Sequence, residues 1–191
     1  MRTLLSFLPA LLLVILASCG KTDLEVEKNE PVTLDIEQMV GLVGQPYTNI
    51  PPVLVTTDVV FSDSLGIRKA SFPVLDRESP NPNFLCELSE KNGVINKITI
   101  KSTVGSHGTF KNTLYYFDRL LSEKYTLSKF YAIDADGGIN KSNNSKSDLY
   151  TYLNYNSSSG AAFEYKAPTA TILNFCFNEA DKAFTISIEK K

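Results

Sequence analysis

The chain has 191 residues and a formal net charge of −2, from 19 basic and 21 acidic side chains. This length suits one domain with a substantial core. The mildly acidic balance, without a basic stripe interleaved with aromatic residues, argues against a nucleic-acid partner. The single histidine excludes Cys₂His₂ zinc sites and the H-E-x-x-H motif, each of which needs two histidines.

The first nineteen residues have the pattern of a targeting signal. Arg2 supplies a positive start, and the apolar run Leu4–Leu16 is too short for a comfortable membrane crossing but suits a signal-peptide core. The run ends in Leu16-Ala17-Ser18-Cys19, where small residues precede a cysteine. This box resembles the lipobox of bacterial lipoproteins. The alternatives are an ordinary secretory signal with a chance cysteine, or an uncleaved N-terminal anchor.

The resemblance implies that Cys19 is the lipidated first residue of the mature chain, anchored to the membrane by acyl chains such as palmitate. In that family an aspartate after the cysteine causes retention at the inner membrane, so Gly20 favours the outer membrane. The acidic cluster Lys21–Glu27 resembles surface-export tags and favours the cell surface over the periplasmic face; the alternative is a solvated tether. The expected organisation is a signal peptide over 1–18, a lipidated tether over 19–32 and a single domain over 33–191.

The first half of the domain is expected to contain one short helix followed by strands. Gly44 provides a C-terminal cap for the helix. Asn92-Gly93 is the strongest short hairpin signal, because both residues accept positive φ. The predicted elements are a helix over 33–43 and strands over 59–61, 67–74, 84–88 and 94–102.

The second half is expected to contain the main helix and a C-terminal meander. The helix spans about Thr109–Tyr125, because one apolar stripe recurs at helical spacing through Phe110, Leu114, Phe117 and Leu121. A polar loop follows over 134–148. Alternating apolar and polar residues then predict four strands, over 149–155, 162–166, 170–177 and 183–189. The fold class is therefore predicted as α+β, an antiparallel β-sheet with one main amphipathic helix packed on a face and a C-terminal β-meander.

Two cysteines remain once Cys19 is lipidated, and they could form a disulfide in an oxidising compartment. Cys86 alternates with Phe84 and Leu88, which predicts an inward side chain. Cys176 alternates with Asn174, which predicts the opposite side of its strand. Both possibilities stay open at this point, a Cys86–Cys176 bridge and two buried thiols.

Few residues in the chain suggest catalysis. His107 lies in a Gly-Ser-His-Gly turn before the main helix, where a structural position is the simpler interpretation. Asp134, Asp136 and Asn140 place oxygen ligands at alternating positions, a weak calcium pattern. However, Ile139 stands where an EF-hand loop needs its glycine and Ser145 where it needs its final glutamate. A solvated turn is therefore the preferred interpretation, and no metal or cofactor is predicted.

Four tyrosines offer a possible binding platform for a sugar or a peptide, the alternative being half-buried packing. They are Tyr150, Tyr152, Tyr155 and Tyr165. The expected lipid anchor, without a recognisable catalytic constellation, favours a non-catalytic binding or interaction module of the bacterial envelope. The expected partners are the membrane and an unidentified protein or glycan. The alternatives are an inhibitor or immunity-type lipoprotein that acts on an envelope enzyme, and a hydrolase that uses two carboxylates.

Overall fold

The computed structural model describes residues 32–49, 60–64, 67–102, 106–140, 145–156, 158–177 and 183–191. The predicted signal peptide, Cys19 and the predicted tether up to residue 31 lie outside these described residues. Residues Pro31–Lys191 form one compact unit. Its described part is a mixed α/β structure built on one large β-sheet.

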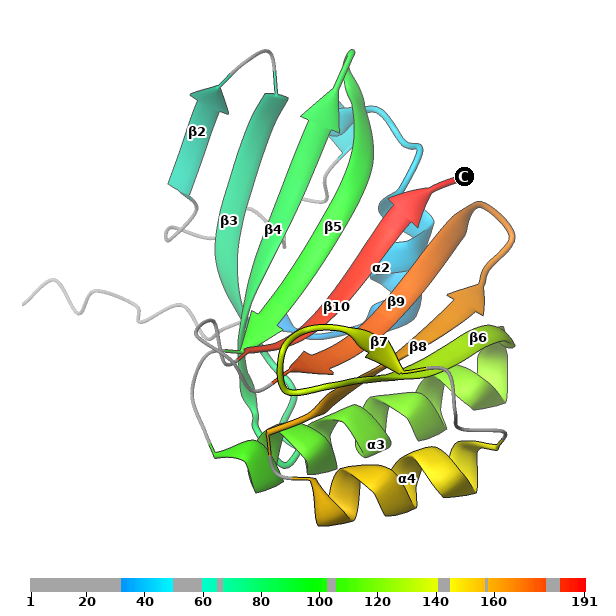
Figure 1. Ribbon diagram of the computed structural model, residues 1–191. Coiled ribbons are helices and arrows are strands. Elements are labelled where there is room, and N and C mark those ends of the chain that lie inside the picture. Colours follow the sequence, from blue (N-terminus) through cyan, green and yellow to red (C-terminus); the bar gives the residue numbers. More distant parts are fainter. Residues whose placement is uncertain are drawn as a thin grey trace, which may run out of the picture. The chain divides into compact units, whose positions relative to one another are not determined.

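Within the described residues, ten strands form a single sheet (Figure 1). Their spatial order is β1-β3-β4-β5-β10-β9-β8-β6-β7, and β2 also pairs with β3. The β1–β3 pair is parallel, and the other neighbours are antiparallel. The strands are β1 (Val32–Thr33), β2 (Val60–Ser64), β3 (Ile67–Leu75), β4 (Asn83–Lys91), β5 (Val94–Ser102), β6 (Thr126–Ile133), β7 (Ile139–Asn140), β8 (Gly160–Lys166), β9 (Ala170–Phe177) and β10 (Ala183–Lys190).

The described helices share one core with the sheet. They are α2 (Ile36–Leu42), α3 (His107–Lys124) and α4 (Lys146–Tyr155), with a 3₁₀ turn η1 (Tyr47–Asn49) after α2. Helix α3 packs on β8, β9 and β10, and α4 packs on β6 and β8. Apolar side chains of all three helices enter the same buried cluster, and Figure 1 shows α3 and α4 side by side. The three helices therefore cover the same face of the sheet.

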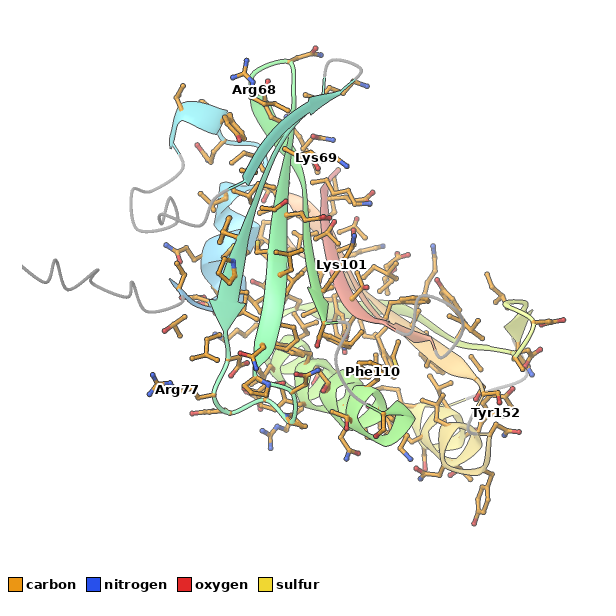
Figure 2. The ribbon with its side chains drawn as sticks, turned by 90° about the vertical axis from the view of Figure 1, so that its left-hand side faces the viewer. Arg68, Lys69, Arg77, Lys101, Phe110 and Tyr152 are labelled. Carbon is orange, nitrogen blue, oxygen red and sulfur yellow. The ribbon has the colours of Figure 1, made fainter. Side chains whose placement is uncertain are left out.

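The strand register separates this covered face from an open face. Paired residues share a face, so one row of the covered face runs through Phe72, Cys86, Ile100, Ile186, Asn174 and Phe163. The open face carries cross-strand ion pairs, Glu87–Lys101 at 3.0 Å and Lys97–Glu189 at 2.6 Å. None of the described helices covers it, and Figure 2 labels Lys101 on this face.

Two predicted elements are confirmed, and each has a local cause. Ser106 caps the start of α3 by accepting a hydrogen bond from the Thr109 backbone N–H at 3.3 Å. Asn92 and Gly93 form the hairpin turn with φ of 58° and 78°, as the Asn-Gly pattern predicts. The predicted apolar stripe of α3 is fully buried; its members are Phe110, Leu114, Phe117 and Leu121.

The predicted strand over 149–155 is wrong, because this segment is helix α4. Leu149 and Leu153 are four residues apart, which places them on one helical face, and both are buried. Ser145 caps the helix by accepting a hydrogen bond from the Asp148 N–H at 3.1 Å. The alternating tyrosines resembled a strand, but their side chains leave opposite sides of a helix. The C-terminal meander therefore consists of three strands, β8, β9 and β10.

One boundary and one further element differ from the prediction. The first helix begins at Ile36 rather than at Thr33, because Asp35 caps it and Thr33 belongs to strand β1. Strand β6 was not predicted at all. The burial of its side chains does not alternate along the strand, and its register against β8 shifts between Leu127 and Lys129.

The two cysteines lie on the same face of the sheet, so the prediction that Cys176 points to the opposite side is wrong. The pairs Cys86↔Ile100, Ile100↔Ile186 and Ile186↔Asn174 place Asn174, and hence Cys176, on the covered face. Three strand spacings of about 4.8 Å separate Cys86 from Cys176, so their Cα atoms lie on the order of 14 Å apart. A disulfide needs less than about 7 Å. Both thiols are free and buried.

We expect neither thiol to react in the folded protein. Burial raises the pKa of the Cys86 thiol and of the Cys176 thiol to about 12, so the reactive thiolate is scarce at neutral pH. A chain that begins at Gly20 keeps the whole compact unit and removes Cys19. Iodoacetamide should add nothing to this chain when folded and should alkylate both cysteines after denaturation without reductant. A denatured chain that stays unmodified would instead demonstrate a bridge.

Candidate functional site

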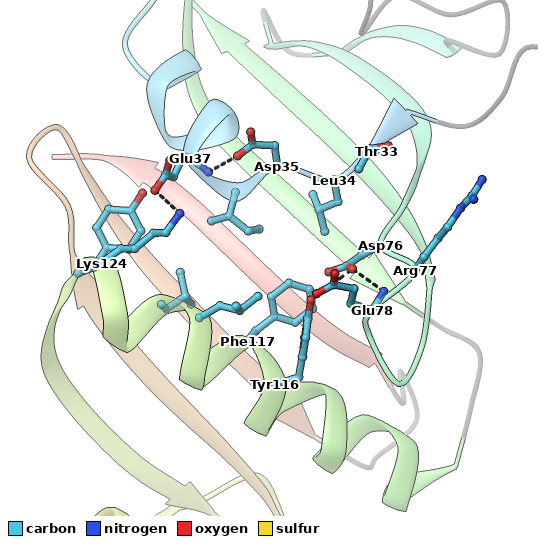
Figure 3. Close-up of a pocket in the computed structure, with 14 residues that line it drawn as sticks. Thr33, Leu34, Asp35, Glu37, Asp76, Arg77, Glu78, Tyr116, Phe117 and Lys124 are labelled. Carbon is cyan, nitrogen blue, oxygen red and sulfur yellow. Dashed lines mark hydrogen bonds and ion pairs between the residues drawn. The ribbon is translucent and has the colours of Figure 1, made fainter.

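Among the hollows lined by the described residues, a groove of about 490 Å³ lies between α2, α3 and the turn that joins β3 to β4. Figure 3 shows its lining side chains converging from these three elements. We call it the α2–α3 groove. Its lining comprises residues 33–37, residues 76–78, Tyr116, Phe117, Leu120, Leu121, Lys124 and Tyr125.

Strand pairing brings the two sides of the groove together. Val32 pairs with Val74 and Thr33 with Leu75, and the Leu34 N–H donates to the Leu75 carbonyl at 2.9 Å. The start of α2 is thereby held beside the β3–β4 turn. Residues about 40 positions apart thus face each other across one groove.

The floor of the α2–α3 groove is apolar and firmly supported. Phe117 is fully buried; its ring stacks on Phe184 at 5.2 Å between centroids and meets Phe84 edge-on at 5.7 Å. Around it, half-buried apolar side chains extend the core to the surface; they are Leu34, Ile36, Leu120, Tyr116 and Tyr125. Apolar area left half-covered in a hollow is typical of binding sites.

On the α2 side, the rim carries two carboxylates with defined partners. Asp35 caps α2 by accepting hydrogen bonds from the Glu37 N–H at 2.9 Å and the Gln38 N–H at 3.1 Å. Glu37 forms an ion pair with Lys124 at the end of α3. Both side chains of that pair are more than half exposed, so water screens it and its contribution to stability is small.

On the β3–β4 side, the rim carries two further carboxylates. Asp76 accepts hydrogen bonds from the Glu78 N–H at 3.0 Å and from the Tyr116 hydroxyl at 3.3 Å. Burial, and then the neighbouring Asp76, raise the pKa of Tyr116 to about 12, so this phenol stays a neutral donor. In Figure 3 the Arg77 side chain extends away from the groove.

The rim as a whole is acidic. Four carboxylates line it against two cationic side chains, and the cationic ones are Arg77 and Lys124. Among the described residues, no group of three or more His, Cys, Asp or Glu side chains could hold a metal ion. The arrangement suits recognition of a ligand that is apolar in part and positively charged in part.

The four predicted tyrosines do not form one platform. Tyr150 and Tyr165 meet, since both hydroxyls donate to the Asp118 carboxylate. Tyr152 instead donates to Asp134 Oδ1 at 2.6 Å. Tyr155, at the end of α4, is 85% exposed. Tyr152 and Tyr155 border a small polar hollow of about 270 Å³.

Asp118 is the centre of a buried polar cluster that joins α3 to α4 and β8. It is only 3% exposed, and Lys146 Nζ lies 2.6 Å from its Oδ2. The Lys146 ammonium also lies 5.4 Å from the centre of the Phe163 ring. Each polar group of the cluster therefore has a partner, which is the arrangement that a buried charge needs.

This cluster should make the protein sensitive to alkali. Burial, and then hydrogen bonding to Asp118, raise the pKa of the Tyr165 phenol above its usual value. The folded chain therefore holds a proton that the unfolded chain releases above about pH 10, so stability falls as pH rises beyond 10, by up to about 1.4 kcal/mol per pH unit for this group. Urea unfolding at pH 9, 10 and 11 should show this slope, reduced in Tyr165→Phe; equal slopes would contradict it.

The predicted calcium-like turn is satisfied internally. Asp134 Oδ1 accepts hydrogen bonds from Tyr152 and from Asn140 Nδ2, the latter at 3.1 Å, and these bonds lower the pKa of Asp134. Asp136 Oδ1 accepts a hydrogen bond from the Gly138 N–H at 3.0 Å. The carboxylates thus hold the turn that connects β6 to β7.

The sequence analysis did not identify the α2–α3 groove. The only local signal is the alternation of acidic and apolar residues over 34–37. The sequence of that segment does not indicate that it lies beside Asp76 and Glu78, because this proximity depends on the parallel β1–β3 pairing.

Comparisons of the chain with protein-family models, with curated proteins and with solved structures found no match. In the part of the chain that the structure describes, no helix has both the length and the apolar character needed to cross a membrane. The candidate function therefore depends on the α2–α3 groove and on the N-terminal sequence.

Proposed function

We propose that this chain is a lipid-anchored, non-catalytic binding protein of the bacterial outer membrane. In this proposal Cys19 carries the lipid, an α+β domain with its main amphipathic helix on one face follows the tether, and the α2–α3 groove is the ligand site. The observation that carries the proposal is the groove itself, where apolar side chains of the core reach the surface inside an acidic rim.

The position of the groove along the chain supports this proposal. The groove begins at Thr33, which is 14 residues after Cys19. A fully extended tether of this length reaches about 50 Å, at up to about 3.6 Å per residue. A ligand held in the groove is thereby kept close to the membrane that carries the anchor.

The roles of the rim carboxylates favour binding over catalysis. Asp35 caps α2, and Glu37 is paired with Lys124. Asp76 accepts hydrogen bonds from the Glu78 N–H and from the Tyr116 hydroxyl. A carboxylate-dependent hydrolase needs one group to deliver a proton and another to act as base or nucleophile. Groups engaged in capping and pairing are better suited to fixing the shape and charge of a binding site.

Site-specific photo-cross-linking in cells tests the groove. A photoreactive phenylalanine analogue at Leu120, on the groove floor, should yield a discrete adduct on irradiation. The same analogue at Thr185, on the open face of the sheet, is the matched control and should not. Equal adducts at both positions, or none at Leu120, would contradict the proposed site. If the captured partner is an enzyme that loses activity on binding, the protein is an inhibitor-type lipoprotein.

Protease treatment of intact cells tests the expected surface location. External protease should degrade the chain on intact cells as readily as in a lysate, because the export-tag-like segment favours the outer face. Protection until lysis would place the domain on the periplasmic side. That result would redirect the search for a ligand to periplasmic partners.

A further inference from the structure

The α2–α3 groove is selective in its chemistry, and this selectivity identifies a class of ligand. We infer that the groove accepts a polypeptide segment in which apolar side chains are flanked by lysine or arginine, presented by a partner protein. This inference rests on the proposed function, because it concerns the same site. It adds the ligand class, which the proposed function leaves open.

The apolar floor sets the first requirement. Leu34 and Leu120 are half-buried, and Phe117 beneath them is fully buried, so a ligand gains by covering this area. A purely polar ligand, such as a small sugar, would leave that area uncovered while desolvating the rim. The volume of about 490 Å³ lies in the usual range for ligand sites. It is large enough for a few side chains of an extended segment.

The rim sets the second requirement. Carboxylates stand on both sides of the floor, on α2 and on the β3–β4 turn; they are Asp35, Glu37, Asp76 and Glu78. Glu37 pairs with Lys124, and the three other carboxylates outnumber the one other cation, Arg77. An occupant with positive charge at either end of its apolar part therefore meets a complementary carboxylate, whereas an acidic occupant is repelled.

The same charge argument excludes two nearby occupants. The tether residues 20–31 contain two lysines and four acidic residues, so the chain's own N-terminal segment carries the same sign as the rim. Bacterial and other lipid surfaces with anionic headgroups also repel an acidic rim. A basic segment of another protein remains the occupant that both the floor and the rim favour.

A peptide panel tests this inference with the chain that begins at Gly20, which keeps the compact unit Pro31–Lys191. The probes are three fluorescent eight-residue peptides of the pattern X-Leu-Phe-X-Leu-X-Gly-Gly, in which X is lysine, glutamine or glutamate. Fluorescence anisotropy should show the lysine peptide binding at least about tenfold more tightly than the glutamine peptide, with a preference that shrinks at high salt. The glutamate peptide should not bind.

Two matched variants show where the charge acts. Glu37→Gln with Glu78→Gln removes two rim charges and should weaken the lysine peptide about fivefold. Glu87→Gln with Glu189→Gln removes the same charge from the open face and should change nothing. Leu120→Gln should weaken both the lysine and the glutamine peptides, because it removes apolar contact from a half-buried position that tolerates a polar side chain.

The outcomes separate the inference from the proposed function. An equal loss of lysine-peptide affinity in the rim and open-face variants would show that only the net charge of the protein matters. That result would overturn the inference. Equal binding of lysine and glutamine peptides, with loss in Leu120→Gln, would overturn the charge requirement and keep the groove as a binding site. Binding to anionic lipid vesicles in preference to any peptide would overturn the inference as well. No peptide binding together with no adduct at Leu120 in cells would overturn both.

Discussion

Replacing Asp118 with alanine is expected to lower the free energy of unfolding by about 3–5 kcal/mol, the usual cost of breaking a buried ion pair. Asp118 is 3% exposed, and it accepts the hydroxyl hydrogens of Tyr150 and Tyr165 besides pairing with Lys146. Tyr165 is fully buried, so its hydroxyl would lose its acceptor with no access to water. Urea unfolding followed by circular dichroism measures the loss directly.

A matched surface pair provides the control for this experiment. Lys97 and Glu189 form an equally short ion pair, 2.6 Å, but their side chains are 41% and 53% exposed. Glu189→Gln should therefore change stability by less than about 1 kcal/mol. If Asp118→Ala lowers the free energy of unfolding no more than Glu189→Gln does, the Asp118 cluster does not stabilise the packing of α4 on α3. Asp118→Asn should lie between the two, because its amide keeps one acceptor oxygen but not the charge.

Elements with a strong local cause were predictable from the sequence. The apolar stripe of α3 and the capping residue Ser106 lie within one short segment of the sequence, and together they specify that helix. The turn at Asn92 and Gly93 needs only two residues with positive φ. In both cases the local sequence favours the same structure that the tertiary contacts require, so the local pattern and the fold agree.

Elements that depend on distant contacts were mispredicted. Asn174 suggested a solvent-facing side of β9, yet it lies in the core because its Nδ2 donates to the Leu114 carbonyl of α3 at 3.1 Å. That single buried polar residue reversed the assignment of Cys176. In α4 the tyrosines misled in a similar way, because Tyr150 and Tyr152 find separate acceptors, Asp118 and Asp134.

The candidate site illustrates the same limit more strongly. Each half of the α2–α3 groove is an unremarkable sequence segment, a capped helix start and an acidic turn. Their proximity follows from two residue pairs between β1 and β3. A short parallel pairing of this kind has no reliable signature in a single sequence, since it joins distant residues and not neighbours. The α2–α3 groove therefore could be identified only from the folded structure.

Removing Cys19, the residue that we propose to carry the lipid, is expected to have the largest effect on where the protein resides. If Cys19 carries acyl chains, the full-length protein partitions into the detergent phase of a phase-separating detergent. A chain that begins at Gly20 behind a cleavable secretory signal should move to the aqueous phase, because each buried CH₂ contributes about 0.8 kcal/mol of membrane affinity and no acyl chain remains.

The control for this experiment keeps the lipid and alters the domain. The Glu37→Gln, Glu78→Gln variant retains Cys19 and should stay in the detergent phase, even though its ligand binding is weakened. Metabolic labelling with an alkyne analogue of palmitate should mark the full-length chain and spare the chain that begins at Gly20. An unlabelled full-length chain in the aqueous phase would refute the lipid anchor while leaving the groove as a binding site, because the rim and floor are built entirely from residues after the tether. Anchor and groove are thus separable, and each can fail without the other.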